Sequence, residues 1–83
     1  MKILPLSPTV SKYLQSHNLI KKYKKQVKLL EEDMHYPSLN VELLEPKVNR
    51  IYSFRLDIKY RTLFIFRDDL NAIEILSITK HYQ

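Results

Sequence analysis

Three apolar runs follow one another in the C-terminal half of the chain, separated by short polar clusters. They cover residues 51–57, 60–67 and 72–80 and are rich in Ile, Tyr, Phe, Leu and Thr. Such runs, with Asp, Asn and Lys between them, are typical of consecutive antiparallel strands joined by tight turns. The middle and last runs are apolar on both faces, at 63–66 and 75–78. We therefore expect both faces of these strands to be covered.

The N-terminal half predicts a short strand followed by two helices. Residues 2–6 are apolar but contain a proline, which favours a short or edge strand. Ser7 and Pro8 are typical of a helix start, so the first helix is expected over residues 8–16. Asn18 is placed to cap a second helix. Its apolar stripe recurs at intervals of three and four residues, at Ile20, Tyr23, Val27, Leu30 and Met34.

The second helix is expected to end at residues 35–39, because the residue before a proline avoids helical geometry. Residues 40–45 then predict a short strand or extended loop, with Leu43 or Leu44 pointing inward. This order of elements predicts a single α+β domain over residues 1–83. A short N-terminal strand and a two-helix hairpin would pack on an antiparallel sheet of three to four strands.

Composition excludes several classes of site. The chain has no cysteine, which excludes disulfides, thiolate metal sites and a cysteine nucleophile. It has no glycine either, which excludes nucleotide-binding folds built on glycine-rich phosphate loops. Its turns must therefore rely on Asn and Asp. No apolar run approaches the ~20 residues of a membrane helix, so we expect a soluble, cytoplasmic protein that does not contact membranes.

The chain is basic, with 14 Lys and Arg against nine Asp and Glu and a net charge of +5. A basic surface suits a polyanion such as RNA, or an acidic protein partner. Lysines occupy the polar faces of the second helix. They form either a solvated surface or a patch that contacts phosphates without sequence preference. These residues are Lys21, Lys22, Lys24, Lys25 and Lys28.

Polar residues gather at one end of the predicted strands. A tight turn over residues 57–59 brings Arg55 and Arg61 together on adjacent strands. A tight turn over residues 68–71 returns the last strand beside the middle one, so that residues 80–82 come near Tyr60 and Arg61. A register shift of one residue would move each side chain to the other face, so the pattern alone leaves the faces open.

This cluster of residue types suits the cleavage of an RNA phosphodiester. The reaction needs a base for the 2′-OH, cations for the phosphorane and an acid for the 5′-oxygen. Arginine binds phosphate in a bidentate way, and histidine titrates near neutrality. The reaction needs no metal ion or other cofactor, and the chain lacks the acidic cluster of a Mg²⁺ nuclease. Taken singly, each residue also has a plain structural explanation, such as a surface ion pair.

Four short motifs accompany the predicted elements. They are His35-Tyr36-Pro37-Ser38-Leu39, residues 52–57, Tyr60-Arg61 and the terminal Lys80-His81-Tyr82. Their order and spacing resemble the RelE/ParE superfamily of toxins from type II toxin–antitoxin systems, over essentially the whole chain. The resemblance implies a microbial-ribonuclease-like α+β fold. It also implies a bacterial, ribosome-dependent mRNA endoribonuclease that inhibits translation by metal-independent acid–base cleavage.

The resemblance favours the RelE/YoeB-like branch of mRNA-cleaving toxins, and the terminal His81-Tyr82 resembles its YoeB-like members, which implies roles for individual residues. Arg61 matches the phosphate-binding arginine, His81 the general acid and Tyr82 the residue that orients substrate. The branch also uses a glutamate base ahead of the strands, for which Glu42 is better spaced and Glu45 is second. Further substrate contacts are expected from Arg55 and Lys80.

The sequence departs from RelE-like members at Ser53 and Phe54, where those members have lysines, so their lysine base has no counterpart. Two alternatives stay open: a ParE-like inhibitor of DNA gyrase, and a non-catalytic relative that only binds an antitoxin. The implied partners are a cognate acidic antitoxin and mRNA on the ribosome. DNA would be contacted only through the antitoxin complex.

Overall fold

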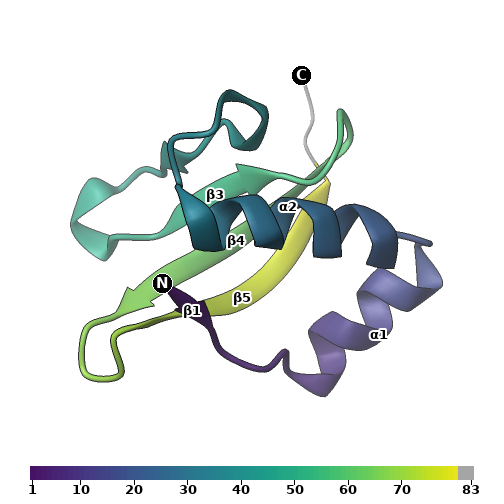
Figure 1. The fold of residues 1–83 in the computed structure, drawn as a ribbon, viewed down its shortest axis with the longest axis horizontal. Coiled ribbons are helices and arrows are strands. Elements are labelled where there is room, and N and C mark those ends of the chain that lie inside the picture. Colours follow the sequence, from purple (N-terminus) through teal and green to yellow (C-terminus); the bar gives the residue numbers. More distant parts are fainter. Residues whose placement is uncertain (81–83) are drawn as a thin grey trace.

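The computed structural model describes residues 1–80, and residues 81–83 lie outside the described part of the chain. Its elements follow the predicted order, from a short strand through two helices to three consecutive antiparallel strands (Figure 1). In chain order they are β1 (Lys2–Ile3), α1 (Pro8–Ser16), α2 (Ile20–Glu32), the 3₁₀ helix η1 (Pro37–Leu39), β2 (Glu42–Leu43), the 3₁₀ helix η2 (Lys47–Asn49), β3 (Tyr52–Arg55), β4 (Tyr60–Arg67) and β5 (Ala72–Lys80).

The five strands form one mixed sheet in the order β1-β5-β4-β3-β2. The α+β class, the three consecutive antiparallel strands and the two helices are confirmed. The sheet has five strands, however, because β1 adds a parallel edge and β2 an antiparallel one. β1 pairs only two residues with β5, Lys2 with Ala72 and Ile3 with Ile73. A pairing this short leaves no periodic signal in the sequence.

Asparagines make several of the turns in this glycine-free chain. Asn18, Asn40 and Asn71 have φ values of 56°, 44° and 49°, the left-handed region that asparagine tolerates better than most residues. Asn18 turns the chain between the helices. The prediction that it caps α2 is wrong. The N-cap of α2 is Leu19, which makes no side-chain capping bond. In contrast, Ser7 caps α1 as predicted, because its Oγ accepts the Val10 N–H at 3.3 Å.

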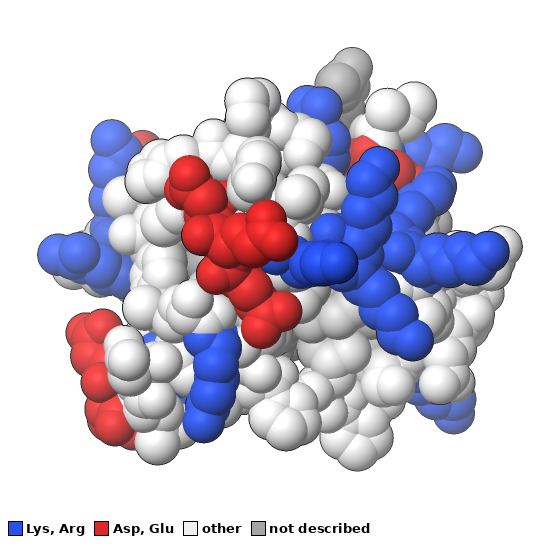
Figure 2. All heavy atoms as spheres, in the orientation of Figure 1, with Lys and Arg blue, Asp and Glu red and all other residues white. Residues whose placement is uncertain are grey.

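α2 separates apolar from charged side chains around its circumference. Tyr23 and Leu30 are buried, while Ile20 and Val27 pack against the core as the stripe predicted. Met34 also packs against the core, but it lies beyond the last helical residue. Exposed lysines line α2 along most of its length, and acidic residues gather over its C-terminal end (Figure 2). They are Lys21, Lys22, Lys24, Lys25 and Lys28, followed by Glu31, Glu32 and Asp33.

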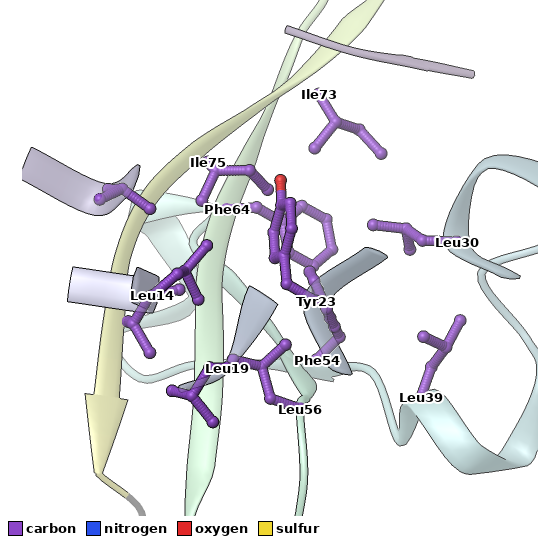
Figure 3. Packing of buried hydrophobic residues seen from close by; sticks show 12 residues of the cluster. Leu14, Leu19, Tyr23, Leu30, Leu39, Phe54, Leu56, Phe64, Ile73 and Ile75 are labelled. Atoms are coloured by element: carbon purple, nitrogen blue, oxygen red, sulfur yellow. The ribbon is translucent and has the colours of Figure 1, made fainter. Parts of the chain in front are cut away.

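The core lies between the two helices and one face of the sheet. Figure 3 shows leucines and Tyr23 from the helical half packed with Phe54, Phe64 and Ile75 from the strands. Because side chains alternate along a strand, Leu63 and Ile65 lie on the opposite face. They are only half-buried, and Leu76 of β5 is 37% exposed. The prediction that both faces are covered is therefore wrong, since α1 and α2 cover only one.

One buried polar side chain connects the layers. Gln26 of α2 donates from Nε2 to the Ser38 carbonyl at 3.1 Å and to the Arg55 carbonyl at 2.7 Å. It therefore holds the end of β3 and the segment leading to β2 against the helix. No helix within residues 1–80 is long and apolar enough to cross a membrane.

Candidate active site

Arg61 is the centre of a polar cluster on the sheet face opposite the helices. It lies near the start of β4 and is only 6% exposed. Its Nε donates to Ser53 Oγ at 2.9 Å, and its Nη2 donates to the carbonyls of Asn40 at 2.5 Å and Ser53 at 3.3 Å. These three acceptors fix the plane of the guanidinium before any ligand arrives.

Glu42 reaches the same guanidinium from the edge strand β2. β2 pairs with β3 so that Glu42 stands opposite Ser53, which places both side chains on the face of Arg61. The Glu42 carboxylate Oε2 lies 3.9 Å from Arg61 Nη2, and its side chain is 50% exposed. Asn40 Nδ2 donates to the other carboxylate oxygen at 3.5 Å. Glu42 is thus both oriented and open to an incoming molecule.

Arg55 adds a second positive charge beside Arg61. The two residues are direct partners across β3 and β4, as a tight turn predicted, and Arg55 is exposed. Burial lowers the pKa of Arg61, the Glu42 carboxylate raises it, and the charge of Arg55 lowers it again, so the net pKa is below its ordinary value. An arginine stays protonated even so. Two cations this close favour an anion bound between them.

Of the remaining predicted residues, the structure describes Lys80 and Glu45. Lys80 is the register partner of Tyr60, so it reaches the predicted end of the sheet. Tyr60 and Arg61 are consecutive, however, and their side chains leave opposite faces of β4. Glu45 follows β2, and no hydrogen bond or ion pair within residues 1–80 joins it to Arg61. His81 and Tyr82 lie outside the described residues, so their roles stay predictions.

Sequence reasoning missed the two residues that hold Arg61. Ser53 was noted only as a departure from a lysine, and Asn40 only as the start of an extended segment. For Asn40 the sequence signal is an asparagine directly after Leu39, a residue type that tolerates the left-handed backbone with which η1 ends. For Ser53 the signal is a small polar residue between apolar neighbours on β3, diagonal to an arginine on β4.

The cluster provides two of the three functions that phosphodiester cleavage needs. Arg55 and Arg61 can hold a phosphate, and the exposed Glu42 carboxylate can accept a proton. An acid is not supplied by these three residues. Within residues 1–80, no group of three or more His, Cys, Asp or Glu side chains is placed to hold a metal ion.

Comparisons with known proteins identify the fold. No family model and no curated protein matches the sequence. Among solved structures, the chain resembles one of a heterotetrameric YoeB–YefM toxin–antitoxin complex from Staphylococcus aureus, with a TM-score of 0.70, 24% identity and 99% coverage of both chains. It also resembles a chain of a YoeB–YefM complex from the same organism, with a TM-score of 0.61, 27% identity and 99% coverage of both chains.

A third similar structure is a YoeB/ParE toxin from Agrobacterium tumefaciens, with a TM-score of 0.71 and 13% identity. The match covers 99% of this chain and 100% of that one. The resemblance to the RelE/ParE superfamily is thereby confirmed as a structural match along the whole chain.

Proposed function

We propose that this chain, whose fold is that of the YoeB toxins of the RelE/ParE superfamily, is the toxin of a type II toxin–antitoxin system and cleaves mRNA on the ribosome. The observation that carries the proposal is the cluster of Glu42, Arg55 and Arg61 on the uncovered face of the sheet. It combines a solvent-accessible carboxylate with two adjacent cations, as acid–base cleavage of RNA requires.

In this mechanism the Glu42 carboxylate takes the proton from a ribose 2′-OH. The 2′-oxygen then attacks the neighbouring phosphorus, and the bond from phosphorus to the 5′-oxygen breaks to leave a 2′,3′-cyclic phosphate. His81 gives a proton to the departing 5′-oxygen, and Tyr82 orients the nucleotide, as the family resemblance implies. One proton is taken from the 2′-oxygen and one is given to the 5′-oxygen, so the step balances without an oxidant. Side chains carry both protons, and no metal ion is required.

The two arginines divide the work of stabilising the phosphorane. Arg61 is buried and already satisfied by Ser53 and Asn40, so it provides a fixed positive charge at the floor of the site. Arg55 is exposed and is free to contact the phosphate oxygens directly. Preorganised charge of this kind costs no rearrangement when the transition state forms. Lys80, at the same end of the sheet, would contact phosphates further along the message.

The proposed partner is an acidic antitoxin. Two of the similar structures are complexes of YoeB with YefM. In this chain, the exposed lysines of α2, the half-buried Leu63 and Ile65 and the exposed Leu76 offer charge and apolar area to a partner that wraps the domain. Action on translating ribosomes and neutralisation by such a partner both place the protein in the cytoplasm.

Mapping of message ends in cells tests the proposal. We expect induced wild-type chain to stop growth and create new 5′ ends within translated messages, detected by primer extension. Glu42→Gln should reduce this cleavage by about 10²- to 10⁴-fold, because the proton acceptor is lost. Glu45→Gln is the matched control and should cleave like the wild type.

Growth arrest with unchanged message ends would contradict the proposal. Accumulating DNA breaks in the same cells would then point to gyrase inhibition. Full activity in Glu42→Gln together with loss in Glu45→Gln would reassign the base to Glu45.

A further inference from the structure

A concave surface lies between the turn that joins α1 to α2 and the turn that joins β3 to β4. Its volume is about 600 Å³, within the usual range for small-molecule sites. The side chains that matter here are His17, Lys22, Asp57, Lys59 and Tyr60. None of them takes part in the cluster around Arg61.

One wall of this cleft is aromatic and already assembled. The imidazole of His17 stacks on Tyr13 with ring centres 3.9 Å apart and planes 16° from parallel. Tyr60 meets His17 edge-on, with ring centres 5.8 Å apart. Tyr60 also meets Tyr13 edge-on at 6.3 Å. His17 is exposed even though Tyr13 covers one of its faces, so aromatic surface is left for a ligand.

Hydrogen bonds hold the His17 ring in this position. Its Nδ1 lies 3.0 Å from the Tyr13 carbonyl and 3.0 Å from Ser16 Oγ. Depending on the tautomer, Nδ1 donates to the Tyr13 carbonyl or accepts from the Ser16 hydroxyl. In either tautomer these contacts hold the ring as a fixed platform for stacking.

Positive charge borders the aromatic wall. Lys22 spans the cleft to Asp57, with 2.8 Å between Nζ and Oδ2, and its side chain is still 53% exposed. Lys59 is exposed in the β3–β4 turn, where the carboxylate of Asp57 accepts its backbone N–H at 2.8 Å. Lys80 stands opposite Tyr60 in the sheet and is also exposed. The cleft thus combines a π surface with cations set around it.

The cleft adjoins the site of the proposed reaction. Tyr60 lines the cleft, and the next residue, Arg61, lies in the catalytic cluster on the other face of β4. The β3–β4 turn and the end of β5 lie together at this end of the sheet (Figure 1). A chain of nucleotides that passes around this end could contact both places.

We propose that this cleft binds single-stranded RNA next to the cleaved phosphodiester, with one base stacked on His17 and bordered by Tyr60, and with the flanking phosphates on Lys59 and Lys22. The inference rests on the proposed function for its substrate. Unpaired bases are commonly recognised by aromatic stacking with cations along the backbone. An acidic peptide would use the lysines but would gain little from the exposed aromatic surface.

Binding of the full chain to a short, fluorescein-labelled, single-stranded 2′-O-methyl RNA tests the inference, because this probe has no 2′-OH nucleophile. We expect His17→Ala to raise the Kd by about 10-fold, as stacking of one base predicts, and His17→Phe to bind like the wild type. Lys59→Gln should raise the Kd several-fold. Lys28→Gln, which removes the same charge from the far part of α2, should change it less than 2-fold.

A probe of the same length without bases separates stacking from charge. The wild type should bind it about 10-fold more weakly than the intact RNA, and His17→Ala should cause no further loss. Equal binding of both probes, equal effects of Lys28→Gln and Lys59→Gln, or loss of binding in His17→Phe would overturn the inference. A chain that binds the probe in this pattern but leaves message intact would refute only the proposed function.

Discussion

Arg61 is held by neighbours that bear no catalytic group of their own. Ser53 supplies both its hydroxyl and its carbonyl to the guanidinium, and Asn40 supplies a carbonyl from the left-handed end of η1. The tight turn predicted that Arg61 would meet Arg55, and the family resemblance implied that Glu42 would belong to the same site. Neither could predict that Arg61 would be buried, because that depends on how the segment before β2 folds over β4.

Loss of the Ser53 hydroxyl should lower the stability of the fold. Ser53→Ala leaves the buried Arg61 Nε without its acceptor, which should lower the free energy of unfolding by about 1–3 kcal/mol. Ser77→Ala is the matched control. Ser77 lies on β5, on the same face of the sheet as Ser53, and its loss should change the free energy of unfolding by less than about 0.5 kcal/mol. Urea denaturation measures the free energy of unfolding of both variants. An unchanged midpoint in Ser53→Ala would show that water replaces the hydroxyl.

The elements themselves were the most predictable part of the molecule. The strands β3, β4 and β5 and the helix α1 begin and end within a few residues of their predicted limits, because alternation, turn residues and the Ser7-Pro8 start all agree there. The short pairings β1–β5 and β2–β3 could not be located from pattern, since each joins only two residue pairs. The role of Asn18 was mistaken because asparagine suits a helix cap and a left-handed turn equally well.

The β3–β4 turn should make part of the stability dependent on pH. Burial acts to raise the pKa of Asp57, but the bonds from Lys22 and from the N–H groups of Lys59 and Tyr60 outweigh it, so the pKa is lowered. A carboxyl with a lower pKa in the folded chain stabilises the fold above about pH 4, and that contribution is lost as the pH falls through the folded pKa.

Asp57→Asn should therefore cost about 0.5–1 kcal/mol at pH 7 and much less near pH 2. Thermal unfolding of both proteins from pH 7 to pH 2 measures this. The two curves should converge in acid. A constant difference across the range would mean that the ionised carboxylate adds nothing to the turn.

At the scale of the whole molecule, function is separated between the two faces of one sheet. The helices and the core occupy one face, and the opposite face carries Glu42, Arg55 and Arg61 beside half-buried apolar residues. Hydrophobic patterning alone suggested a sheet covered on both sides. Under the proposed function, the uncovered face is where substrate and antitoxin would compete, so an antitoxin would neutralise the chain by occlusion.

Cleavage by purified components tests the central claim most directly. Purified chain is mixed with ribosomes stalled on a defined message, and the rate of appearance of cut message is measured. Arg55→Gln removes the exposed cation of the cluster, whereas Arg50→Gln removes an exposed arginine at the opposite end of β3. We predict that the wild type and Arg50→Gln cut the message at similar rates and that Arg55→Gln is at least about 10²-fold slower. Intact message with the wild-type chain, or equal rates for the two variants, would contradict the account.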